Sequence, residues 1–231
     1  MSKTIITFLF TIICFYTYGQ EKMMINQPCV GLMDYGFVAG TTEIDSLQKF
    51  PIEIQTLSKT FIKNSLTEFE GNMKFSFGKI IDFDKLLKKD SNFQMEYTSY
   101  VPKYELFYEL TDTSLGIQKY CFILGFSEYT HLMRMNWPWK NYEKKSNFID
   151  PKLVKAEAIK YAKSKNYKTD TCIYELKYDI EIGKLCWYIS FLQISIGDKY
   201  NYSKEYKTIV IDAILLNVLE ELEMVSRGYS D

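Results

Sequence analysis

Catalytic side chains are scarce in this sequence. A serine or cysteine hydrolase needs a histidine as its general base, and the chain contains a single histidine, His131. It falls within a predicted strand at 129–136, where a histidine with its own satisfied hydrogen bond is the commoner arrangement. We therefore expect His131 to be structural and predict no hydrolase triad.

Carboxylates offer an alternative chemistry, because two acids suffice to hydrolyse a glycosidic bond. Acidic residues alternate along the predicted strands, so successive members share a face; they are Glu105, Glu109, Glu175, Asp179 and Glu181. Such a row is typical of the solvent-facing side of a half-covered sheet. We predict that the protein is not an enzyme and has no catalytic residues. A carboxylate-dependent hydrolase ranks last among the functions considered.

Metal and cofactor motifs are also missing from the sequence. No C-x-x-C pair accompanies the single histidine, so neither a zinc site nor a thioredoxin-like centre is predicted. There is no D-x-D-x-D-G run for calcium, and Gly31, Gly36 and Gly40 do not match the G-x-G-x-x-G nucleotide loop. With 28 basic and 29 acidic residues, the net charge of −1 provides no attraction for nucleic acid. We predict no metal, no cofactor and no nucleic-acid partner.

Residues 1–19 have the three parts of a secretory signal peptide. Lys3 supplies the positive region, Thr4–Tyr18 is an uncharged and largely apolar run, and Gly19 is a small residue before Gln20. A membrane-spanning helix needs about 20 apolar residues, and no later stretch reaches that length without charge. We expect cleavage near Gly19 and an exported protein, periplasmic or secreted, with no membrane span in the mature chain. The alternative is an uncleaved N-terminal anchor.

Four cysteines remain after that cleavage, namely Cys29, Cys121, Cys172 and Cys186. An exported protein meets oxidising conditions, so one or two disulfides are expected. Four cysteines allow three complete pairings, and the spacing does not choose among them. The alternative for Cys121 and Cys186 is a buried thiol, because both lie in apolar runs.

The composition is that of a folded chain. Of 231 residues, 47% are hydrophobic, and only 11 are glycine and 5 proline. Helical spacing of apolar residues predicts a helix at 52–69, and alternation predicts the strands that follow. These strands are 73–83, 93–101, 104–112, 117–126 and 129–136. We place a first α+β unit at 20–136 and a polar linker, containing aromatic residues, at 137–150.

The second unit, 151–231, repeats the same order of elements. Asp150 is a good N-cap and Pro151 suits the first turn of a helix that Asn166 can end. Alternation predicts strands at 172–182, 185–197 and 206–214. Residues 215–226 fit either a final strand or a short amphipathic helix.

The two halves also resemble each other in sequence. Tyr104–Leu110 is similar to Tyr174–Ile180, and each segment leads through a glycine to a run of cysteine and aromatic residues. We predict an α+β fold of two tandem units, each a helix followed by an antiparallel sheet. The alternative is that strands rich in tyrosine, leucine and isoleucine look alike by chance.

The second half resembles the PepSY-like and cystatin-like exported domains over roughly 151–225. The hairpin ends in the apolar strand Trp187–Phe191, and the last strand closes on Val210–Ala213. The alanines of the matching helix are Ala156, Ala158 and Ala162. The family pattern has a glycine in the next turn, whereas Ile214–Asn217 has none. The resemblance implies a non-catalytic periplasmic or secreted domain that binds or restrains another protein.

Three aromatic residues of the linker form the most distinctive local cluster, Trp137, Trp139 and Tyr142. Grouped aromatics on a loop favour a recognition surface, and we nominate the three as partner-binding residues. The alternative is that they fill the seam between the halves. We expect an exported protein-binding or inhibitory module whose target is another protein. A periplasmic immunity protein that neutralises a toxin is the second candidate.

Overall fold

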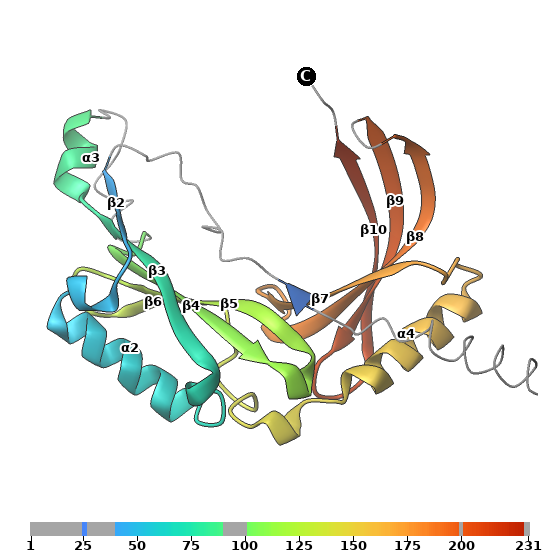
Figure 1. Cartoon of the computed structure of the whole chain (residues 1–231), viewed down its shortest axis with the longest axis horizontal. Helices are drawn as coiled ribbons and strands as arrows, with labels where there is room; N and C mark the ends of the chain where they lie inside the picture. The colour runs from blue at the N-terminus through green and yellow to red at the C-terminus, as the bar shows by residue number, and fades with distance from the viewer. Residues whose placement is uncertain (1–24, 27–39, 90–100, 199–200, 229–231) are drawn as a thin grey trace, which may run out of the picture.

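The computed structural model describes residues 25–26, 40–89, 101–198 and 201–228, and it shows a mixed α+β protein (Figure 1). The helices within these residues are α2 (Ile52–Ser65), α3 (Phe83–Lys89) and α4 (Pro151–Ser164). One sheet is made of β1 (Ile25–Asn26), β2 (Thr41–Ile44), β3 (Met73–Ile81), β4 (Tyr104–Asp112), β5 (Ile117–Phe126) and β6 (Leu132–Met135). The other is made of β7 (Cys172–Asp179), β8 (Lys184–Gly197), β9 (Tyr202–Asp212) and β10 (Val218–Gly228).

The first sheet has the order β1-β5-β4-β3-β2, and β6 also pairs with β5. All its pairs are antiparallel except β1 with β5. Helix α2 covers one face, because Phe61 stacks on Phe122 and the Tyr108 hydroxyl donates to the Ser58 hydroxyl at 3.1 Å. The alternation along β4 and β5 therefore sends every second side chain into the core under α2.

The outer edge of β5 is shared by three partners. Strand β1 pairs near its start and β6 near its end. Between them the Asn136 side chain takes the place of a strand, since its amide nitrogen donates to the Cys121 carbonyl at 2.6 Å. Its amide oxygen accepts from the Ile123 N–H at 2.7 Å. Buried backbone groups on this edge are thereby satisfied.

The second sheet is an antiparallel meander in the order β10-β9-β8-β7. Helix α4 crosses it, and its buried side chains Val154, Ala158 and Ala162 allow close contact with the sheet. As predicted, Asp150 caps the helix by accepting from the Lys152 N–H at 2.8 Å. Beyond the C-terminal end of α4, strands β8, β9 and β10 continue and project from the rest of the molecule (Figure 1).

One hydrophobic core runs through both sheets. It includes residues under α2 and α4 together with Trp137 and Tyr142 from the segment between the sheets. Strand β1 lies beside β7, so the edges of the two sheets meet there. The segment 137–150 therefore connects the halves by packing as well as by sequence.

The strands predicted at 104–112 and 117–126 are confirmed as β4 and β5, and residues 215–226 are resolved as a strand. Helix α3 and strand β2 were not predicted. The proposed signal peptide at 1–19 and the strand at 93–101 lie outside the described residues. Among the residues that are described, no helix is long and apolar enough to cross a membrane.

The cysteines fall into two groups. Cys172 and Cys186 are free thiols, whereas Cys121 is disulfide-bonded to a partner outside the described residues. Burial is the main reason that the pKa of the Cys186 thiol rises to about 12, and the negative charges of Asp179 and Asp212 add to it.

Candidate functional site

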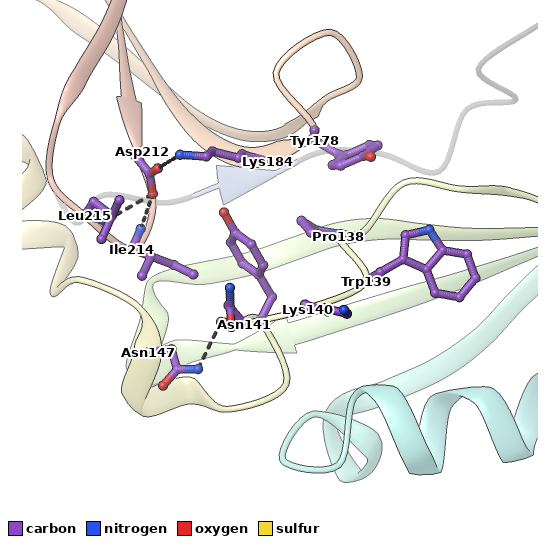
Figure 2. Close-up of a pocket in the computed structure, with 12 residues that line it drawn as sticks. Pro138, Trp139, Lys140, Asn141, Asn147, Tyr178, Lys184, Asp212, Ile214 and Leu215 are labelled. Atoms are coloured by element: carbon purple, nitrogen blue, oxygen red, sulfur yellow. Dashed lines mark hydrogen bonds and ion pairs between the residues drawn. The ribbon is translucent and has the colours of Figure 1, made fainter.

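An open pocket lies where the segment 137–147 meets the two turns of the second sheet. Its volume is about 790 Å³ (Figure 2). One wall comes from the linker, through residues such as Trp139 and Tyr142, and the opposite wall from Lys184, Asp212 and Leu215. The walls come from segments that are far apart in the sequence, so the pocket exists only when the linker is packed against the second sheet.

The three nominated aromatic residues have different surroundings. Trp137 is only 1% exposed and Tyr142 is also buried, whereas Trp139 is 64% exposed. Trp137 packs edge-on against Phe69 and Tyr120 in the shared core. The three side chains therefore do not form one exposed platform. Trp137 fills the seam, and Trp139 alone is accessible to a partner.

Trp139 is exposed but not loosely attached. Its ring meets Phe61 of α2 edge-on, with centroids 5.8 Å apart. Figure 2 shows the indole directly after Pro138, on the side away from Asp212 and Leu215, and it is one of the residues that line the pocket. A large apolar side chain is thereby held at a fixed position in contact with solvent.

Tyr142 forms part of the pocket wall with its ring in the core. Burial raises the pKa of its phenol to about 12, and the charge of Asp212 contributes in the same direction. The Leu185 backbone amide opposes the shift by hydrogen bonding to the phenol oxygen. The phenol is therefore neutral at physiological pH and presents a hydroxyl, not a charge.

An ion pair between Lys184 and Asp212, at 2.6 Å, forms the polar part of the opposite wall. The Asp212 carboxylate also accepts from the N–H groups of Ile214 at 2.8 Å and Leu215 at 3.1 Å. Burial alone would raise the pKa of Asp212, but the Lys184 ammonium and these two amides outweigh it and the pKa is lowered. The Asp212 carboxylate thus holds the turn through these contacts. Leu215, which belongs to this turn, is exposed at the rim of the pocket.

Aspartate carboxylates accept hydrogen bonds from the following turn at two other strand ends. Asp112 ends β4 and accepts from two backbone amides of the next turn, and Asp179 does so at the end of β7. Such Asx turns fix the chain direction after a strand. This role was not predicted from the sequence, although an aspartate at the end of an alternating run, just before a turn, is the signal that indicates it.

The turn after Asp212 contains a strained residue. Leu216 has φ +58°, a left-handed conformation in which a Cβ atom is unfavourable. This is the turn in which the PepSY-like pattern has a glycine. Leu216 packs against the core while its backbone takes the conformation that glycine prefers.

Substitution at Leu216 tests this strain. We expect Leu216→Gly to be more stable than Leu216→Ala by about 1 kcal/mol, because both lose the same packing but only glycine adopts a positive φ without cost. Urea denaturation measures the difference. The control is the exposed helical residue Leu153, where the order should reverse because glycine weakens a helix. Equal stabilities at position 216 would contradict the assignment of strain.

The other candidate residues are engaged in structural interactions. His131 is exposed and directly precedes β6, and its backbone N–H donates to the Ser127 hydroxyl at 3.1 Å. The prediction of a solvent-facing row is wrong for Glu105, which is buried on β4 and forms an ion pair with Arg134 at 3.2 Å. Burial raises the pKa of Glu105, and the Arg134 charge opposes the shift.

The remaining carboxylates show no catalytic pairing. Glu109 forms an ion pair with Lys119 at 2.5 Å, and Glu175 with Lys177 at 2.6 Å. In the part of the chain that the structure describes, no group of three or more histidine, cysteine or acidic side chains is placed to hold a metal ion.

Comparison with known proteins gives no assignment. No family model matches the chain, and neither the curated proteins nor the solved structures contain a match.

Proposed function

We propose that this protein is an exported, non-catalytic module that binds another protein through the pocket between its linker and its second sheet. The observation that carries the proposal is that Trp139 lines the pocket, is 64% exposed and is held by an edge-on contact with Phe61. Exposed tryptophans that a partner can bury are the commonest binding hot spots. A side chain that is already held in place loses little conformational entropy when it binds.

The opposite rim supplies a second apolar contact. Leu215 is exposed there, and the hydrogen bonds of Asp212 hold its turn. Trp139 and Leu215 thus face a partner from two sides of the pocket, with the neutral Tyr142 hydroxyl in the wall between them. We propose that a segment of the partner places an apolar side chain in this pocket.

The proposed architecture is that of two tandem units of the PepSY-like and cystatin-like kind. Its support is that α2 is followed by the meander β3-β4-β5, and α4 by the meander β7-β8-β9-β10. In each half the helix packs against its own sheet. The pocket would then lie at the start of the second unit, where the linker meets the turns of the second sheet.

Affinity capture from the cell envelope and medium tests the proposed function. We expect a partner that the unmodified protein retains and Trp139→Ala binds at least about tenfold more weakly, because hot-spot truncations cost about 2 kcal/mol or more. The matched control is Tyr129→Ala, since Tyr129 is an exposed aromatic residue of another loop that is not among the pocket residues.

The outcomes separate the alternatives. Equal loss of binding in Trp139→Ala and Tyr129→Ala, or equal retention in both, would contradict binding at the pocket. Failure to retain any partner would contradict the binding function. A captured toxin would make the protein an immunity protein, the special case in which the restrained partner is harmful to its own cell.

A further inference from the structure

The outer edge of β10 has no strand partner within the described residues, because β10 is the last strand in the order β10-β9-β8-β7. From Glu220 to Gly228 it pairs with β9 without a bulge, and it contains neither proline nor lysine. Proline, lysine and bulges are the usual means by which proteins protect an exposed edge. A long, regular edge without these features is a template for another strand.

The surroundings of this edge are also exposed. Strands β8, β9 and β10 project beyond α4 (Figure 1). Val225 of β10 is 55% exposed, and the register places it opposite Glu205 of β9, which is opposite Ile194 of β8. Ile194 is exposed as well. Apolar side chains therefore lie on the uncovered part of the sheet next to the open edge.

We propose that β10 pairs antiparallel with β10 of a second copy of this chain, with Val225 on the twofold axis. Antiparallel pairing of identical strands places one residue opposite its own copy, and residues at equal distances on either side of it face each other. With Val225 at the centre, Glu223 of the first copy lies opposite Arg227 of the second. By symmetry, Arg227 of the first copy also lies opposite Glu223 of the second. Two opposite-charge pairs then flank an apolar contact.

Neighbouring registers fit less well. Centring on Glu223 places like charges opposite each other, which is destabilising. Centring on Met224 pairs Arg227 with Glu221, but the Glu221 carboxylate already accepts from Tyr161 at 3.2 Å and from Tyr167. Glu223 is the more available carboxylate, since it is highly exposed and interacts with Lys207 alone among the described cations.

The dimer would join two four-stranded sheets into one continuous sheet of eight strands. The surface is separate from the pocket that contains Trp139, so this inference does not depend on the proposed function. A twofold dimer of this kind does not grow into a longer assembly, because the β10 edge of each copy is already occupied by the other copy.

Sedimentation velocity of the purified protein over a wide concentration range tests the proposal. We expect a concentration-dependent dimer for the unmodified protein. Val225→Lys should weaken it by about tenfold or more, because it places two like charges at the axis. Ile173→Lys is the matched control, since Ile173 is 53% exposed on β7 and the substitution should leave the dimer unchanged.

A charge exchange tests the register. Arg227→Glu should weaken the dimer, because the introduced carboxylate lies opposite Glu223 of the second copy. The double variant Glu223→Arg with Arg227→Glu exchanges the two charges and should restore the dimer. A monomer at every concentration, or a dimer that tolerates Val225→Lys, would overturn the proposal. Failure of the double variant to restore association would overturn the Val225 register. Circular dichroism and urea midpoints establish that each variant is folded.

Discussion

Replacing Trp137 with alanine is expected to lower the free energy of unfolding by about 3–5 kcal/mol, the cost of removing a fully buried tryptophan from a core. Trp137 is 1% exposed and touches rings from the first half and from the linker, including Tyr120 of the first sheet and Phe148. No neighbouring segment can refill so large a cavity without breaking the seam. Urea denaturation followed by circular dichroism measures the loss.

Two further variants make this prediction specific. Trp137→Phe should cost much less than the alanine variant, because the ring contacts are largely kept. The indole Nε1 that it removes has no hydrogen-bond partner among the described residues. Trp139→Ala should leave the unfolding free energy nearly unchanged, since its ring is mostly exposed. Comparable losses of unfolding free energy in Trp137→Ala and Trp139→Ala would contradict the placement of Trp137 in the core and Trp139 in solvent.

Replacing Asp112 with alanine is expected to cost about 2–4 kcal/mol, because it removes a cap and leaves a partner charge without its counterion. The carboxylate of this buried residue accepts from the Ser114 and Leu115 amides and from the Asn72 side chain at 2.9 Å, and it pairs with Lys145 at 2.6 Å. It thus ties the β4–β5 turn to the linker. Asp45→Ala, which breaks an exposed ion pair with Lys49, is the control and should change stability little.

The pH dependence of this effect has a defined sign. Burial alone would raise the pKa of Asp112, but Lys145, Ser114 and Leu115 outweigh it, and the pKa is held below its ordinary value of 3.8. Folding therefore favours the charged form, and the stabilisation is complete above pH 3.8 and lost as the pH falls through the folded-state pKa. Urea midpoints of the unmodified protein and Asp112→Asn should converge below pH 3.8. A gap that stays constant with pH would contradict this assignment.

Local patterns in the sequence were sufficient for the long strands. Strands β4 and β5 are long and rich in aromatic and β-branched residues, and they are buried over most of their length. Helix α3 is only seven residues long and strand β2 only four. Neither spans enough positions to establish a period, and both depend on contacts with distant segments.

The candidate site was only partly predictable. The sequence singled out Trp137 and Trp139, but it did not show which was buried. Residues two apart in a regular extended segment point to the same side, but the backbone bends at Trp137 and again at Trp139. These bends place one indole in the core and the other in contact with solvent. The far wall, with Lys184 and Asp212, comes from tertiary packing that no local pattern encodes.

The buried Cys186 thiol has a consequence for redox chemistry. Thiol–disulfide exchange proceeds through the thiolate, and a pKa of about 12 keeps this thiolate scarce at neutral pH. Cys186 therefore cannot readily attack the disulfide of Cys121, and burial also shields it from small oxidants. At Cys186, therefore, the fold protects a thiol from exchange by controlling access to its sulfur rather than by changing the surrounding medium.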